Sequence, residues 1–161
     1  MIIDFESLEG IRDQHPTDRI VFAGGVFDLM HPGHLDLFRH MREAGELTVV
    51  AVSTDRRVRE RKGHTRPIHA ALTRLAMVDA IRYVDLSLIA PEAIPETDVP
   101  TLRMIQALKP DIFMSSDESW LKFEDKVNRH GTELVVIPRF SEIVSTSQTI
   151  DRILEVHSIP T

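Results

Sequence analysis

The residues best suited to chemistry stand close together near residue 30, where His31 and His34 flank Pro32 and Gly33. Residues three apart share one face of a helix, so both imidazoles can project toward the same ligand. Pro32 suits the first turn of a helix, and Gly33 lets a ligand approach the backbone closely. Imidazole N–H groups can donate hydrogen bonds to phosphoryl oxygens and stabilise charge that develops on them. The pair therefore predicts a site that handles phosphoryl groups.

A glycine-rich turn precedes the two histidines, in the stretch AGGVFDLMHPGH at residues 23–34. It follows a short apolar run that is typical of a strand, and it leads into a segment with helical periodicity. In open α/β sheets ligands bind at the carboxyl ends of the strands, and a helix N-terminus there offers free N–H groups to a phosphate. Gly24 and Gly25 leave room for a nucleotide to lie against the strand end.

Five short apolar runs alternate with helical segments along the chain. The runs expected to be strands are Arg19–Gly24, Leu47–Val52, Tyr83–Ile89, Asp111–Ser115 and Glu133–Pro138. Helices are expected from His31 to Gly45 and around Leu72–Ala80, Leu102–Leu108, Trp120–Val127 and Ile150–His157. This alternation predicts an α/β fold that is Rossmann-like, with a five-stranded parallel sheet and helices on both faces.

Length and composition limit the function classes. The 161 residues carry 19 Lys and Arg against 25 Asp and Glu, and no Cys. A net charge of −6 argues against nucleic acid or anionic membrane as a partner, and the lack of Cys excludes thiolate catalysis. Apolar runs are too short for a membrane span, so a cytoplasmic protein is expected. We expect a single domain over residues 1–161, with 1–18 as an N-terminal helical extension and Ala90–Pro100 as a surface loop.

The string GVFDLMHPGH at residues 25–34 resembles the G-x-F-D-x-x-H-x-G-H signature of the cytidylyltransferase-like nucleotidyltransferases. Three further features match that family: a Lys62-Gly63 segment after the second strand, Arg74 early in the next helix, and Arg139 shortly before Ser145-Thr146-Ser147 at the last helix. The resemblance runs from about Arg19 to Ile153. It implies a Rossmann-like fold and nucleotidyl transfer.

The implied reaction is attack by a small phosphorylated acceptor on the α-phosphorus of a nucleoside triphosphate, with pyrophosphate leaving together with Mg²⁺. The resemblance assigns the catalytic residues as His31, His34, Lys62 and Arg139. It assigns nucleotide binding to Gly24, Gly25, Val26, Phe27, Arg74, Asp117, Ser145 and Thr146. In these assignments Lys62 closes over the triphosphate, Arg74 and Arg139 hold phosphate oxygens, and Asp28 orients the turn or approaches the acceptor. A homodimer is implied by the same analogy.

Three functions remain open at this point. The first choice is transfer of CMP to an acceptor such as glycerol 3-phosphate, because Ile81–Asp85 resembles glycerol-3-phosphate cytidylyltransferase. The alternative is ATP-dependent transfer to a heptose 1-phosphate-like sugar phosphate, because Lys62–Ile68 resembles the ADP-heptose synthase transferase domain. A non-catalytic nucleotide-binding protein is the alternative from another class. It is kept open by Ser116, where many family members have glycine before the residue matching Asp117, and by Ser147, which replaces a threonine.

Without the resemblance, several of these features have plainer interpretations. The run Arg56–Lys62 is typical of a solvated face, Ser145-Thr146 of a simple helix N-cap, and the apolar residues Trp120, Phe123 and Val127 of a core helix. A dinucleotide-dependent oxidoreductase is disfavoured because no G-x-G-x-x-G follows the first strand.

Overall fold

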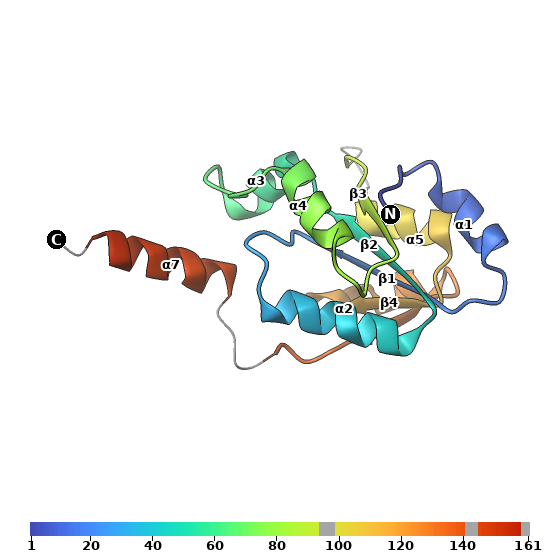
Figure 1. The fold of residues 1–161 in the computed structure, drawn as a ribbon. Helices are drawn as coiled ribbons and strands as arrows, with labels where there is room; N and C mark the ends of the chain where they lie inside the picture. The colour runs from blue at the N-terminus through green and yellow to red at the C-terminus, as the bar shows by residue number, and fades with distance from the viewer. Residues whose placement is uncertain (94–98, 141–144, 159–161) are drawn as a thin grey trace.

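Five parallel strands form the sheet in the computed structural model, which describes residues 1–93, 99–140 and 145–158 (Figure 1). Their order is β3-β2-β1-β4-β5, so the chain crosses over between β3 and β4. The strands are β1 (Ile20–Gly25), β2 (Leu47–Val52), β3 (Leu86–Ile89), β4 (Ile112–Ser115) and β5 (Glu133–Val136). The predicted α/β fold with a five-stranded parallel sheet is confirmed.

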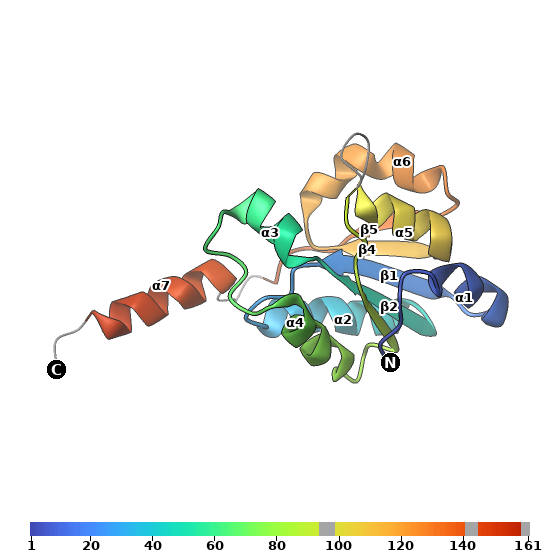
Figure 2. The same ribbon diagram turned by 90° about the horizontal axis from the view of Figure 1, so that it is seen from above.

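Helices cover both faces of the sheet (Figure 2). One face carries α1 (Leu8–Gln14), α5 (Pro100–Leu108) and α6 (Glu124–Asn128); the other carries α2 (Pro32–Ala44) and α4 (Ala71–Asp79). Three more elements are α3 (Asp55–Lys62), the 3₁₀ helix η1 (Glu118–Phe123) and α7 (Thr146–His157). No helix in the described part of the chain is both long and apolar enough to span a lipid bilayer.

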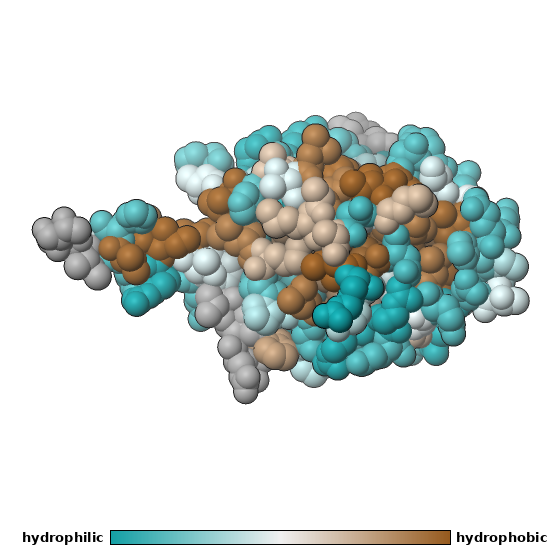
Figure 3. Space-filling view, in the orientation of Figure 1, coloured by the Kyte–Doolittle hydropathy of each residue, from teal (hydrophilic) through white to brown (hydrophobic). Residues whose placement is uncertain are grey.

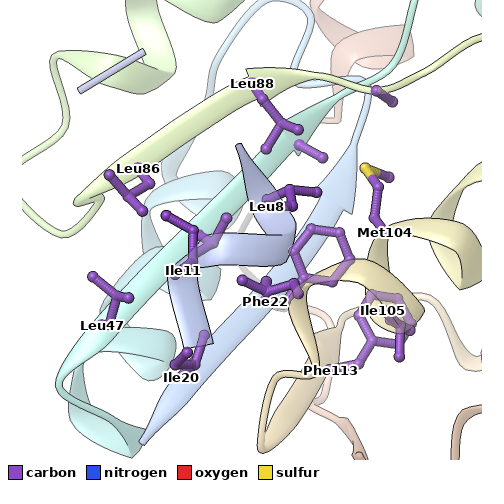
Figure 4. Packing of buried hydrophobic residues seen from close by; sticks show 14 of the residues in the cluster. Leu8, Ile11, Ile20, Phe22, Leu47, Leu86, Leu88, Met104, Ile105 and Phe113 are labelled. Atoms are coloured by element: carbon purple, nitrogen blue, oxygen red, sulfur yellow. The ribbon is translucent and has the colours of Figure 1, made fainter. Parts of the chain in front are cut away.

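The sheet is held by apolar side chains that point alternately to its two faces. Phe22 and Val49 pack with Leu8 of α1 and Met104 of α5, in the cluster that Figure 4 shows. Their neighbours, Val21 among them, pack against α2 and α4. Burying one such side chain stabilises a fold by about 1.5–3 kcal/mol, so continuous apolar runs favour a strand covered on both faces.

The structure moves some predicted boundaries. The third strand begins at Leu86, because the chain before it forms a turn in which the Val84 amide bonds the Ile81 carbonyl. Residues 1–3 are extended beside β3, where the Ile3 amide donates to the Ser87 carbonyl at 2.9 Å, so only part of the 1–18 extension is helical.

One other region differs from expectation, and another is described only in part. Trp120–Val127 is a 3₁₀ turn followed by α6, not one helix. In the expected loop Ala90–Pro100, residues 94–98 lie outside the described chain. That residues 1–161 form a single domain stays a prediction.

Helix α3 was not predicted, because its sequence is dominated by charge and buries only Val58. Its boundaries do carry local signals. The Thr54 side chain caps the first turn by accepting from the Arg57 amide, Asp55 lies in that turn, and Gly63 ends the helix with φ 91°. The charged run is therefore a short helix at the carboxyl ends of the strands.

Candidate active site

A cleft of about 910 Å³ opens at the carboxyl ends of the strands. It brings together residues from the ends of β1, β2, β4 and β5 and from the starts of α2 and α7. Of the residues predicted for the site, those that line it are Gly24, Gly25, Val26, Phe27, Asp28, His31, His34, Lys62, Asp117, Arg139, Ser145 and Thr146. Arg74 does not.

The turn between β1 and α2 has a tightly determined shape. Phe27 and Leu29 have φ values of 51° and 45°, in the left-handed region that costs a non-glycine residue energy. The Phe27 ring is buried and meets the His34 ring edge-on, with centroids 5.4 Å apart. A Cβ on Gly25 would lie 2.7 Å from the Phe27 ring, so glycine is required there for the ring to fold back. The strained turn fixes the position of the histidine pair.

His31 and His34 stack on one another, with ring centroids 3.9 Å apart. The His31 backbone amide donates to Nδ1 of His34 at 3.4 Å, so the neutral His34 ring carries its proton on Nε2. Burial, reinforced by His31 and the positive charge of Lys62, lowers the pKa of His34 to about 4. Burial lowers the pKa of His31 as well. At neutral pH the pair therefore offers uncharged N–H donors, and the buried Nδ1 of His31 has no hydrogen-bond partner among the residues that the structure describes.

Asp28 joins three segments that are far apart in the sequence. Its buried carboxylate accepts hydrogen bonds from the amides of Ile68 (2.7 Å) and His69 (3.0 Å) and from the Arg66 guanidinium (3.2 Å). Its carbonyl accepts from the Thr146 hydroxyl at 2.9 Å. Burial opposes ionisation of the carboxyl, but the His69 and Ile68 amides and the charge of Arg66 outweigh it, so its pKa is lowered. Asp28 thus orients the turn, and it also holds the chain that follows Lys62.

Lys62 is the last residue of α3 and lies at the cleft near His34. Desolvation and the neighbouring charges of Arg66 and Arg61 lower its pKa. Arg139, after β5, also lines the cleft; it is exposed, and both it and Arg61 of α3 lie close enough to Asp117 to favour ionisation of that carboxylate. The cleft therefore carries cations on more than one wall.

The N-terminus of α7 faces the cleft and has backbone N–H groups that are free to bind a ligand. The Ser145 hydroxyl accepts from the Gln148 amide, and the Gln148 side chain accepts from the Ser145 amide at 2.7 Å. This capping box satisfies one backbone donor of the first helical turn and leaves those of Thr146 and Ser147 without a partner among the described residues. Ser145 is thus an N-cap whose helix still has amides to offer an anion.

The structure places Arg74 outside the lining of the cleft. Its side chain is completely buried and donates to the carbonyls of His69, Val26 and Ser53 and to the Asp55 carboxylate at 2.7 Å. The guanidinium therefore links the turn, the end of β2 and α3, and its assignment to nucleotide binding stays a prediction. The position of the Arg74 guanidinium depends on how the surrounding segments pack, and sequence spacing does not give that packing.

Several residues in the cleft were not predicted as site residues. Arg57, Arg61 and Arg66 line it, the first two from α3. The i, i+4 spacing of Arg57 and Arg61 could have indicated that both face the cleft, but the run Arg56–Lys62 that contains them is also typical of a solvated face. Trp120 and Phe123, expected in the core, also line the cleft, although Trp120 still packs edge-on against Phe113 with centroids 4.7 Å apart.

Residues that could hold a metal ion by themselves are lacking in the described chain: no group of three or more His, Asp or Glu side chains comes together there. Mg²⁺ prefers oxygen ligands and usually keeps substrate phosphates among them. The donor set of this cleft, mainly N–H groups and cations, fits a triphosphate that brings its own Mg²⁺.

The chain is similar in sequence to known proteins of one family. Residues 22–155 match the protein family described as "Cytidylyltransferase-like". The chain is 36% identical over 122 residues to the bifunctional protein HldE of Gluconobacter oxydans, covering 74% of this chain but 24% of that protein. It is 34% identical over 142 residues to FAD synthase of Thermococcus sibiricus, covering 84% of this chain and 92% of that one.

A solved structure shares this fold. The lipopolysaccharide core biosynthesis protein of Thermoplasma volcanium superposes with a TM-score of 0.64 at 26% identity, covering 77% of this chain and 99% of that one. The chain spans about a quarter of the length of the HldE relative.

Proposed function

The chain belongs to the cytidylyltransferase-like family and is a nucleotidyltransferase, and we propose that it transfers AMP from ATP to a small phosphorylated acceptor, releasing pyrophosphate. The observation that carries the proposal is the stacked pair of neutral histidines at the start of α2, facing a cleft with an unpaired helix N-terminus and several cations.

ATP is favoured over CTP by the relatives. HldE is the protein whose transferase domain the segment Lys62–Ile68 resembles, and FAD synthase makes a product that contains adenine. CMP transfer to an acceptor such as glycerol 3-phosphate, our first choice from the sequence, becomes the second candidate.

The proposed step is an in-line displacement. An oxygen of the acceptor phosphate forms a bond to the α-phosphorus, and the bond from that phosphorus to the oxygen bridging to the β-phosphorus breaks. His31 and His34 donate N–H groups to the oxygens on which charge builds up. Lys62, Arg139 and the amides at the start of α7 hold the triphosphate. Mg²⁺ carried by the triphosphate would neutralise part of the phosphate charge.

Pyrophosphate release tests this proposal. The wild-type protein is incubated with Mg²⁺, each of the four nucleoside triphosphates and a panel of phosphorylated acceptors. We expect release with ATP that depends on the acceptor. His34→Asn should reduce it by about a hundredfold or more, as the loss of one transition-state donor does. His130→Asn, which removes an exposed histidine outside the cleft, should leave it unchanged.

The rival class predicts a different outcome. A non-catalytic nucleotide-binding protein would bind ATP with measurable affinity and release no pyrophosphate with any acceptor. CTP-dependent release with glycerol 3-phosphate would favour the second candidate.

We also propose that the protein is a homodimer, as the family resemblance implies. Helix α7 projects from the rest of the chain (Figure 1), and Ile153, Leu154 and Val156 on it are about half or more exposed. Figure 3 shows this apolar surface on the helix. Apolar side chains gathered on an exposed helix favour contact with a second copy.

A further inference from the structure

Two arginines of α3 have no role in the step described above. Arg57 and Arg61 are one helical turn apart, and both line the cleft. Within the described chain neither guanidinium forms an ion pair. Their neighbour Arg56, by contrast, is paired with Glu92 at 2.9 Å. Arg61 is close enough to Asp117 to favour ionisation of that carboxylate, but in the described chain no carboxylate lies within ion-pair distance of either guanidinium, so both can bind an anion.

The two side chains also surround a small hollow beside the main cleft, at the end of β2. The residues that line it are Val26, Ser53, Arg57, Val58, Arg61 and Lys62. Arginine presents a fork of N–H donors that matches two oxygens of a carboxylate or phosphate. The hollow itself, at about 10 Å³, has room for no more than about one water, so an anion bound by these arginines would lie in the main cleft, which both also line.

Charge in the cleft is opposite in sign to the charge of the chain. Among the described lining residues six are Arg or Lys and three are Asp, whereas the chain carries −6. All three aspartates already lie near cations: Asp28 lies 3.2 Å from Arg66, Asp36 lies 2.7 Å from Arg39, and Asp117 is close to Arg139 and Arg61. A local cationic excess on an acidic protein attracts a polyanion.

The order of the strands separates the two halves of the cleft. β4 and β5 lie on one side of β1, with Asp117 and Arg139 at their ends, and β2 lies on the other side, followed by α3. In the proposed function the histidines, Lys62, Arg139 and the start of α7 contact the triphosphate. Arg57 and Arg61 have no part in that contact and are left for the acceptor.

We propose that Arg57 and Arg61 bind a second anionic group of the acceptor, so that the substrate is a phosphate ester that carries a further phosphate or carboxylate. This inference rests on the proposed function, because it assumes that the main cleft holds a nucleoside triphosphate.

The experiment measures the binding of matched probes by isothermal titration calorimetry. The protein is first saturated with Mg²⁺ and α,β-methylene ATP, which cannot react at the bond in question and fills the triphosphate site. Glucose 1-phosphate is compared with glucose 1,6-bisphosphate, and glycerol 3-phosphate with 3-phosphoglycerate. The first pair differs by a phosphate and the second by a carboxylate. We expect the more anionic member of at least one pair to bind about tenfold more tightly or better.

Variants assign the preference to residues. The double variant Arg57→Gln/Arg61→Gln should lose the preference, and Arg57→Lys/Arg61→Lys should keep part of it. Arg59→Gln is the matched control, because Arg59 lies on the same helix but does not line the cleft. Melting temperatures of all variants check that the fold is kept.

Two results would overturn the inference: equal binding of both members of each pair, or a double variant whose main defect is weaker binding of α,β-methylene ATP, which would assign the arginines to the triphosphate. Failure of the proposed function is a separate result. It would show as anion preference lost in the double variant but no pyrophosphate release from ATP with any acceptor.

Discussion

Protonation of His34 should make the stability of this protein depend on pH, and the structure sets the size of the effect. The pKa of this imidazole is about 4 in the folded chain, against 6.5 for a free histidine. Because the folded value is lower, the unfolded chain binds more protons, and the free energy of unfolding falls as pH decreases from about 6.5 toward 4. At pH 5 the group is about 97% protonated in the unfolded chain and about 10% in the folded one.

The magnitude follows from these two fractions. Between pH 7 and pH 5 the linkage removes about 2 kcal/mol of folding stability, and the complete loss, reached below pH 4, is about 3 kcal/mol. Replacing His34 by glutamine removes this contribution and leaves the other titrating groups in place. The stability of His34→Gln should therefore fall by about 2 kcal/mol less than that of the wild type over the same interval.

Urea unfolding at pH 7 and pH 5 measures this difference for the wild type and for His34→Gln. His130→Gln serves as the control for losing one imidazole outside the cleft. Titration of the His34 ring by NMR gives an independent reading of its pKa. If wild type and His34→Gln lost equal stability between the two pH values, or if the ring titrated near 6.5, the argument that burial keeps this histidine neutral would be refuted.

Three further predictions concern positions with different roles. Arg74→Met should lower the free energy of unfolding by about 3–5 kcal/mol, because it leaves a carboxylate and buried carbonyls unpaired; a variant of normal stability with a raised KM for ATP would contradict this structural role. Gly25→Ala should lower the melting temperature, because the added Cβ would displace the Phe27 ring. Gly24→Ala is the control and should keep the wild-type melting temperature, because its Cβ would meet nothing closer than 3.8 Å. Equal melting temperatures for the two variants would refute the steric argument. Leu154→Glu should shift a homodimer toward monomer in light scattering without lowering the melting temperature of the monomer, and an unchanged mass would exclude α7 as the contact.

Local features of the sequence were enough to predict most of the fold and the centre of the site. β2 was predicted with its correct bounds because a strand buried on both faces is a continuous apolar run. The junction of β1 and α2 was predicted because glycines, proline and the two histidines act within one turn of chain. Gly45 ends α2 as expected, but glycine is needed there for lack of space and not for a left-handed backbone conformation. Its φ of −167° is extended, and a Cβ there would lie 2.3 Å from the Arg19 carbonyl oxygen.

What only the tertiary structure decided are the contacts between distant segments. Asp28 and Thr146 are 118 residues apart, and no local sequence pattern predicts the hydrogen bond between them. An arginine in a helix can face a phosphate, as expected for Arg74, or be buried among carbonyls, and an arginine in a charged run can face solvent or, like Arg57, a cleft. Sequence periodicity specifies which residues share a face of an element. Which partner that face meets depends on how the elements pack, and this determined both the buried arginine and the cationic wall of the cleft.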